Sequence, residues 1–257
     1  MRQVPIALLL FACLGGIVLA LPKQEKFFIA CANVTCNELS QRQVQQISEA
    51  ITVKILGKNF LGSGTLLRHK ENVYTVITNA HVLRTSEPPY QIQTSDGRIY
   101  QATVVKDVDW DENDLGLLQF RGADVVYKVG KLGDSSSLAI EDKVFVGGFT
   151  SKAEDSEKNS FMFTSGEVSL VLNKALDAGY QIGYTNNIHK GMSGAPLLNH
   201  RGEVVGINGR HKFPLWDATE LYKDGSQVCK PLQELITSSS LAVPVKTLTQ
   251  LAPKYFK

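Results

Sequence analysis

A serine between glycines marks the segment of this sequence best suited to chemistry. It lies in the stretch from Gly191 to Pro196, which reads Gly-Met-Ser-Gly-Ala-Pro and precedes an apolar run. Glycines let the backbone bend so that two N–H groups point at one spot beside a projecting hydroxyl, as acyl transfer requires of a nucleophile and an oxyanion hole. A plain glycine-rich turn is the alternative for this segment taken alone. We therefore take Ser193 as a candidate nucleophile.

A histidine and an aspartate lie beside apolar strands elsewhere in the chain. His81 follows an apolar run, so its ring is expected at a strand end, where a base can face a cleft. Asp114 precedes an apolar run that requires burial, and an unpaired buried carboxylate costs several kcal/mol, so Asp114 needs a partner such as an imidazole. Taken alone, a core or surface histidine and a strand-capping aspartate are the alternatives. Three nearby carboxylates lie further from the buried run and suit a solvated loop: Asp107, Asp109 and Asp111.

The order of these three residues along the chain limits which known type of catalytic triad they could form. It is His, Asp, Ser, whereas the α/β-hydrolase order is Ser, Asp or Glu, His, and the subtilisin order is Asp, His, Ser. Of these three known arrangements, only the chymotrypsin order agrees. The three segments together are therefore a stronger signal than any one of them.

Short strands dominate the sequence around these residues. Alternating or β-branched apolar runs recur at spacings of about 8–12 residues with turns between them, which favours an all-β sandwich or barrel over alternating strands and helices. The expected strands cover 51–56, 60–67, 73–78, 90–94, 99–105 and 115–120 in the first half, and 143–149, 161–164, 167–172, 180–185, 195–198 and 203–207 in the second.

Helical patterns occur near the two ends of the folded part. Residues 37–49 suit a short surface helix, with Asn37 or Ser40 as its N-cap. Near the C-terminus, apolar residues recur from Val245 to Tyr255 at helical spacing. The polar, turn-rich stretch 130–137 is expected to link two all-β halves.

The first twenty residues have the pattern of a secretory signal peptide. Arg2 precedes an unbroken apolar run at 6–21, and Val18 to Ala20 suits a cleavage site. A membrane anchor is the alternative, but the run is shorter than the roughly 20 residues that a spanning helix needs. The pattern predicts a signal peptide at 1–20, a segment at 21–36, and a secreted or periplasmic protein.

Composition and cysteine usage exclude several classes of protein. With 43% hydrophobic and 20% charged residues and a net charge of +2, the chain is neither disordered nor basic enough for a nucleic-acid or polybasic membrane binder. Cys31 and Cys36 are spaced for a small disulfide loop in an exported protein, which leaves Cys229 without an evident partner. No Cys/His cluster has metal-site spacing, so we expect neither a metal nor a cofactor.

The chain resembles chymotrypsin/trypsin-fold serine proteases, and most closely the bacterial HtrA-type protease domains. The resemblance implies two six-stranded antiparallel β-barrels, at 37–132 with His81 and Asp114 and at 133–257 with Ser193. It also implies that His81 is general base and acid, that Asp114 orients it, and that the Gly191 and Ser193 amides hold the oxyanion. The matching stretches are 62–67, 76–82, 114–118, 132–136, 164–168, 190–199 and 206–208.

The chain departs from the family pattern at several places. Met192 stands where trypsin-like zymogens have an Asp that pairs with a new N-terminus, so we expect no activation by that route. Ala195 replaces the usual second Gly, and fewer than fifty residues follow Asn208, which is too few for a PDZ domain. Residues 212–226 form an insertion that we expect to act in substrate access.

The resemblance also gives a candidate specificity residue and a function. Counting back six residues from Ser193 reaches Asn187, the family's position at the base of the pocket for the residue before the scissile bond. Because Asn is neutral, we expect an uncharged residue there. The sequence thus predicts an exported serine endopeptidase acting on protein or peptide substrates, with no nucleic-acid partner and no membrane association after signal cleavage. An esterase and a catalytically silent binding protein on the same fold are the alternatives.

Overall fold

The computed structural model describes residues 38–122, 125–151, 160–213 and 220–256. Contacts divide the chain into residues 1–36 and 37–257, and the description concerns the second unit. The predicted signal peptide and the predicted Cys31–Cys36 disulfide lie outside the described residues. Within those residues, no helix is long and apolar enough to cross a membrane.

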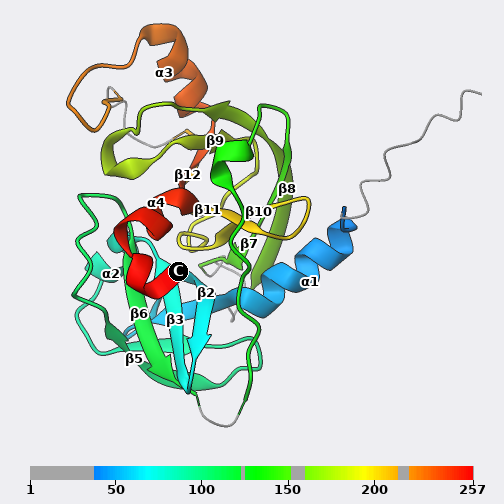
Figure 1. Cartoon of the computed structure of the whole chain (residues 1–257), viewed down its shortest axis with the longest axis vertical. Helices are drawn as coiled ribbons and strands as arrows, with labels where there is room; N and C mark the ends of the chain where they lie inside the picture. The colour runs from blue at the N-terminus through cyan, green and yellow to red at the C-terminus, as the bar shows by residue number, and fades with distance from the viewer. Residues whose placement is uncertain (1–37, 123–124, 152–159, 214–219, 257) are drawn as a thin grey trace, which may run out of the picture. The chain divides into compact units, whose positions relative to one another are not determined.

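The first half of the described chain forms a closed antiparallel barrel (Figure 1). Its strand order is β1-β2-β3-β6-β5-β4, so β1 closes the barrel by pairing with β4. The strands are β1 (Thr52–Leu56), β2 (Phe60–Lys70), β3 (Val73–Thr78), β4 (Tyr90–Gln93), β5 (Ile99–Val104) and β6 (Gly116–Arg121).

The second half forms another closed antiparallel barrel, in the order β10-β11-β12-β9-β8-β7. The prediction of an all-β chain with two six-stranded antiparallel barrels is therefore confirmed. The connection between the barrels, 122–142, contains the predicted boundary at 132–133. The strands are β7 (Lys143–Phe149), β8 (Phe161–Val171), β9 (Ile182–Tyr184), β10 (Pro196–Asn199), β11 (Val204–Arg210) and β12 (Ser240–Pro244).

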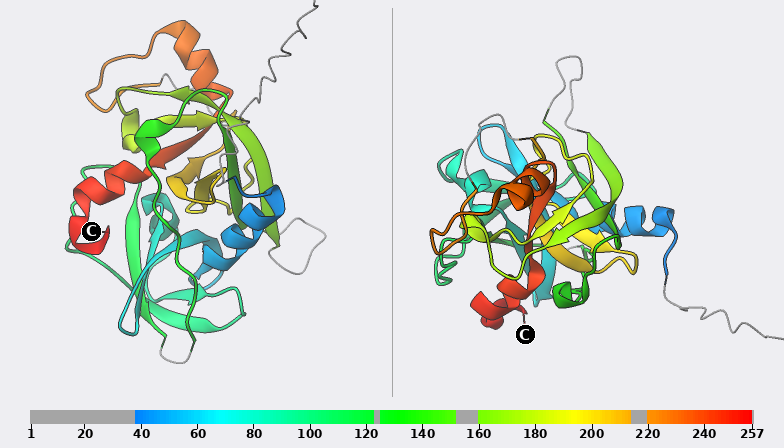
Figure 2. Two further views of the ribbon diagram at one scale, coloured as in Figure 1. Left: turned by 45° about the vertical axis from the view of Figure 1, so that its right-hand side comes forward. Right: turned by 90° about the horizontal axis from the view of Figure 1, so that it is seen from above.

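The helix α1 (Gln41–Ile51) precedes the first barrel and packs on both barrels (Figures 1 and 2). The predicted Ser40 cap is confirmed, because Ser40 and Gln43 bond each other's backbone amides in a capping box. The Ser48 hydroxyl at the far end of α1 donates to the Gly147 carbonyl of β7 at 3.4 Å. This bond fixes the helix to the second barrel just before the chain enters the first.

The remaining helices are short. The helix α2 (Ala80–Arg84) directly follows β3, and α3 (Lys230–Thr237) lies at the end of the second barrel away from the first (Figures 1 and 2). The predicted C-terminal helix is two helices, α4 (Val245–Leu251) and α5 (Pro253–Phe256). The break falls at Ala252, because a residue before proline is disfavoured in the α conformation.

Three predictions for the second barrel were incomplete. The expected strands 161–164 and 167–172 are one continuous strand, β8, which passes through Gly166. A side chain at Gly166 would overlap the buried Asn186 side chain, so glycine permits a close approach here rather than a break. The strand β12 and the helix α3 had no expected counterpart in the sequence.

The hydrophobic core extends across both barrels. One cluster joins Leu67 and Ile77 of the first barrel to Leu198 and Val243 of the second. Two smaller clusters fill the individual barrels. The continuous core joins the first barrel, whose helix α2 carries His81 and whose loop before β6 carries Asp114, to the second barrel, whose loop before β10 carries Ser193.

Candidate active site

The short helix α2 positions His81. The strand β3 ends at Thr78, and the chain turns at Asn79 into α2, so His81 lies one residue inside a helix rather than at a strand end as predicted. The His81 amide donates to Asp114 Oδ1 at 2.9 Å, and His81 Nδ1 lies 2.6 Å from Asp114 Oδ2. The carboxylate therefore fixes both the backbone and the ring of the histidine.

The Asp114 carboxylate is buried and well supplied with donors. Only 5% of its surface is exposed, and the Tyr180 hydroxyl donates to Oδ2 at 2.6 Å. Burial disfavours the charged form, but the hydrogen bonds and charge of His81 and the bond from Tyr180 outweigh it, so the Asp114 pKa lies below its usual value. Ionised Asp114 can thus hold the imidazole in one orientation and stabilise its protonated form.

The three rival aspartates have other partners. Asp107 bonds Lys254 Nζ at 2.5 Å and the Tyr255 hydroxyl at 2.7 Å. Asp109 accepts the Asp111 amide, and Asp111 pairs with Lys223. None of these contacts involves a histidine, so Asp114 is the carboxylate that the structure brings to His81.

Strand β2 of the first barrel supports the loop that carries Ser193. The Ser63 amide donates to the Ser193 carbonyl at 2.9 Å, and the Ser63 hydroxyl donates to the Gly191 carbonyl at 2.9 Å. The Thr65 hydroxyl donates to the Gly194 carbonyl at 2.9 Å. Both side chains are fully buried, so three bonds from one strand fix the nucleophile loop.

Two amides of this loop are available as an oxyanion hole. Within the described part of the chain, neither the Gly191 nor the Ser193 amide donates a hydrogen bond to the protein. The amides of Met192 and Gly194 do donate to backbone carbonyls, at 3.1 and 2.8 Å. Gly191 and Gly194 have φ of 98° and 85°, which only glycine adopts readily. Unengaged amides are what an oxyanion hole needs, so the assignment of Gly191 and Ser193 stays a prediction.

The segments that carry His81 and Ser193 meet at Gly62 of β2. A side chain at Gly62 would contact Val82, next to His81, at 3.0 Å and the Ser193 carbonyl at 3.4 Å, so the helix and the loop meet there. The Ser193 hydroxyl is 3.5 Å from the Gly209 carbonyl, and among the described residues it forms no hydrogen bond with the His81 ring.

The predicted specificity residue lies on the surface beside this loop. Asn187 is exposed, and its Nδ2 is 3.2 Å from His189 Nε2. The preceding Asn186 is buried and bonds backbone carbonyls of strands β7 and β8. The pocket assignment of Asn187 therefore stays a prediction.

Other candidate groups do not join the site. Cys229 carries an exposed free thiol at the start of α3. Within the described ranges, no group of three or more His, Cys, Asp or Glu side chains is arranged to hold a metal ion.

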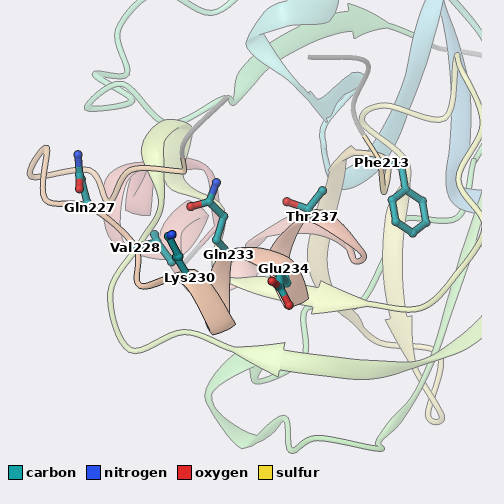
Figure 3. A pocket seen from close by; sticks show the side chains of 7 residues that line it. All are labelled: Phe213, Gln227, Val228, Lys230, Gln233, Glu234 and Thr237. Carbon is teal, nitrogen blue, oxygen red and sulfur yellow. The ribbon is translucent and has the colours of Figure 1, made fainter. Parts of the chain in front are cut away.

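A hollow of about 770 Å³ lies beside α3, and neither His81, Asp114 nor Ser193 lines it (Figure 3). Its lining belongs wholly to the chain after β11 and mixes polar and apolar side chains. The lining residues are Phe213, Gln227, Val228, Lys230, Gln233, Glu234 and Thr237.

Comparison with known proteins agrees with this geometry. The family model of the trypsin-like peptidase domain matches residues 62–207, which contain all three candidate catalytic residues. This chain belongs to the trypsin-like peptidase family. The resemblance and the fold class predicted from the sequence are confirmed.

The chain is also similar to individual curated proteases. It is 31% identical over 153 residues to the probable serine protease do-like of Buchnera aphidicola subsp. Acyrthosiphon pisum (strain APS), covering 58% of this chain and 29% of that protein. It is 30% identical over 151 residues to the periplasmic pH-dependent serine endoprotease DegQ of Escherichia coli (strain K12), covering 58% and 30%. It is 34% identical over 139 residues to mouse serine protease HTRA4, covering 52% and 27%. The chain thus spans under a third of the length of these relatives.

The two residues that depart from the family pattern around Ser193, Met192 and Ala195, are both buried in this peptidase domain. Met192 is fully buried in the core of the second barrel. Ala195 is also fully buried, and a side chain at Gly148 would lie 2.9 Å from its methyl group. The methyl group added at Ala195 is therefore accommodated because the facing residue in β7 is glycine.

Proposed function

We propose that this protein is an exported serine endopeptidase that works through a His81–Asp114–Ser193 triad and an acyl-enzyme intermediate. The observation that carries the proposal is the His81–Asp114 pair at 2.6 Å, and the Ser193 loop supports it with two amides that donate to no acceptor in the described residues. A silent binding protein has no need to keep a buried carboxylate ionised against an imidazole. That property is useful for moving a proton.

The proposed reaction begins when the Ser193 hydroxyl turns from the Gly209 carbonyl to His81 Nε2. Its oxygen attacks the peptide carbonyl carbon while His81 takes the proton, and the oxyanion is held by the amides of Gly191 and Ser193. Collapse of this intermediate breaks the C–N bond, and His81 returns the proton to the leaving amine. Water then attacks the acyl-serine ester, with His81 again as base, and restores the hydroxyl.

The substrates we propose are proteins or peptides encountered in the periplasm or outside the cell. The relatives named as periplasmic endoproteases and the signal-peptide pattern support this location. Between Gly179 and Ser193 the sequence has no acidic side chain that would pair with a basic substrate residue. We therefore propose that the residue before the scissile bond is uncharged, with Asn187 beside its pocket.

Labelling by a fluorophosphonate, followed by peptide cleavage, tests this function. The wild-type protein should be labelled on Ser193 and should cleave peptides, and Ser193→Ala should abolish both while the thermal unfolding midpoint stays unchanged. Loss of a triad member costs on the order of 10⁴–10⁶ in kcat. Ser137→Ala, at an exposed serine in the turn before β7, is the matched control and should behave as wild type.

The alternatives give different results in the same experiment. An unlabelled wild-type protein would show a silent binding protein. A labelled protein that hydrolyses esters but no peptide of a broad library would show an esterase. Peptide cleavage that survives Ser193→Ala would exclude Ser193 as the nucleophile.

A further inference from the structure

A buried tyrosine of the second barrel bonds the carboxylate of the first. Tyr180 is 6% exposed, and its hydroxyl donates to Asp114 Oδ2 at 2.6 Å, the same oxygen that faces His81 Nδ1. We propose that Tyr180 is a positioning residue of the triad: it fixes the rotation of the Asp114 carboxylate, and through that carboxylate the imidazole of His81. The inference rests on the proposed function, because it assigns Tyr180 a task in the same site.

The space that the Tyr180 phenol occupies is left open by a glycine. A side chain at Gly209 of β11 would overlap the Tyr180 hydroxyl and lie 2.7 Å from its Cε1, and would also lie 2.9 Å from Asn79 Nδ2. The Gly209 carbonyl lies 3.5 Å from the Ser193 hydroxyl, which donates to it. Gly209 and Tyr180 are therefore a matched pair, because any larger residue in the strand would push the phenol off the carboxylate.

The segment that carries Tyr180 is fixed to the aspartate loop. The Asp114 amide donates to the Ala178 carbonyl at 2.9 Å, and a side chain at Gly179 would overlap that of Asn113. Ala178 and Gly179 both have positive φ, 59° and 85°, which forms the tight turn that brings Tyr180 against the aspartate. This segment therefore contacts Asp114 twice: the Ala178 carbonyl accepts its amide, and the Tyr180 hydroxyl donates to its carboxylate.

The insertion after β11 supports the same segment from behind. The Asp177 amide donates to the Leu221 carbonyl at 2.9 Å, and the Lys223 amide donates to the Ala175 carbonyl at 2.9 Å. Lys223 also pairs with Asp111 in the aspartate loop at 2.6 Å. The described part of the insertion therefore contacts both the segment that carries Tyr180 and the loop that carries Asp114, and the expected role in substrate access stays a prediction.

The phenol suits this task because it donates and does not ionise. Burial, and then the nearby Asp114 charge, raise the Tyr180 pKa well above its usual value. The Arg210 guanidinium lies 5.9 Å from the centre of the Tyr180 ring and is paired with Glu220. The hydroxyl proton consequently stays on Tyr180 and points at Oδ2 in every protonation state of His81.

The test replaces the hydroxyl alone. Tyr180→Phe should lower kcat/KM for a peptide by roughly 10-fold to 100-fold, the range expected for one lost hydrogen bond to a charged group. KM should change by no more than about twofold, because Tyr180 is buried away from substrate. The acid limb of the pH profile should move to higher pH, since an Asp114 oxygen with one donor fewer attracts the imidazolium more strongly.

A spectroscopic measurement separates this proposal from the proposed function. The Nδ1–H proton of His81 between imidazole and carboxylate should give a strongly deshielded ¹H resonance, assigned by its loss in His81→Ala. Tyr180→Phe should shift and broaden this resonance, whether or not the protein cleaves any peptide. If the wild type shows the resonance but no activity, the endopeptidase assignment fails while the role of Tyr180 is still tested.

Two further variants keep the proposal falsifiable. Tyr74→Phe removes another buried hydroxyl, one that bonds the Val125 carbonyl, and should change stability without moving the resonance or the pH profile. Gly209→Ala should displace the phenol and reproduce the effect of Tyr180→Phe on the resonance. If Tyr180→Phe and Gly209→Ala both leave the resonance and the profile as in wild type, or if Tyr74→Phe moves them equally, the proposal is overturned.

Discussion

Gly194 follows the nucleophile at a point where both conformation and space exclude a side chain. Its φ is 85°, and a Cβ there would overlap the Ser63 carbonyl oxygen and the Thr78 hydroxyl. Both groups belong to buried strands of the first barrel and have no room to withdraw. The loop that carries Ser193 therefore meets the first barrel at van der Waals distance, which is how two separate barrels build one site.

Gly194→Ala should cost about 3–5 kcal/mol in the free energy of unfolding, from the left-handed conformation together with overpacking. It should also abolish labelling of Ser193, because the loop cannot relax without moving its amides. Gly225→Ala is the matched control: its φ is 79° with no atom within 4 Å, so it should cost only about 1–2 kcal/mol. Urea unfolding and fluorophosphonate labelling measure both effects. Equal costs for the two variants would refute the packing argument.

The residues that carry the proposed chemistry differ in how visible they are in sequence. Ser193, His81 and Asp114 are recognisable because small residues or apolar runs surround them and their order along the chain matches one known arrangement. Tyr180 was missed because it lies in a strand-like run and bonds Asp114 across 66 residues of sequence. The turn before it, where Ala178 and Gly179 have positive φ, is a property of the structure that the sequence does not indicate.

The turn between β10 and β11 shows how a charged residue can stabilise strand ends. Glu203 is 8% exposed and accepts hydrogen bonds from Lys131 at 2.7 Å and from Arg201 at 2.9 Å. The Lys131 bond, opposed by burial and aided by Asn199 and Arg201, lowers the Glu203 pKa to about 2. The carboxylate therefore joins the hairpin to the chain segment that enters the second barrel.

A carboxyl group with a lowered pKa stabilises the folded state only at pH values where the group is ionised. Glu203→Gln should lower the free energy of unfolding by about 1–2 kcal/mol at neutral pH, where both states of wild type carry the ionised group. The loss should shrink as pH falls below the usual Glu pKa of about 4.3 and approach zero only below the folded-state pKa of about 2, where the folded wild type is protonated as well. Urea unfolding across this range measures it. A difference that stays constant with pH would point to packing rather than charge.

The boundaries of helices and strands could be predicted from the sequence where they depend on neighbouring residues alone. Strand β3 and the Ser40 cap of α1 were predicted because alternation and capping are local properties. Strand β12 was not predicted from the sequence. In the structure it pairs with β9 and β11, which come earlier in the chain. The sequence alone did not reveal these tertiary partners.

The two barrels share one core, which makes them dependent on each other. A side chain at Gly130, in the connection between barrels, would meet Val204 of β11 at 2.8 Å, Ile51 of α1 at 3.1 Å and Leu67 of β2 at 3.2 Å. Ile51 is 1% exposed and lies in the cluster that spans both barrels. Helix α1 thus fills the junction while bonding β7 through Ser48.

We therefore expect the described unit to unfold as one cooperative system rather than barrel by barrel. Ile51→Ala should remove about 2–5 kcal/mol, and hydrogen exchange should show the same loss of protection in the amides of β3 and β12, because the cluster that contains Ile51 spans both barrels. Ile99→Ala, at a side chain 53% exposed on β5, should leave both unchanged. If protection falls in one of the two strands and persists in the other, the barrels are independent folding units and the shared cluster does not couple them.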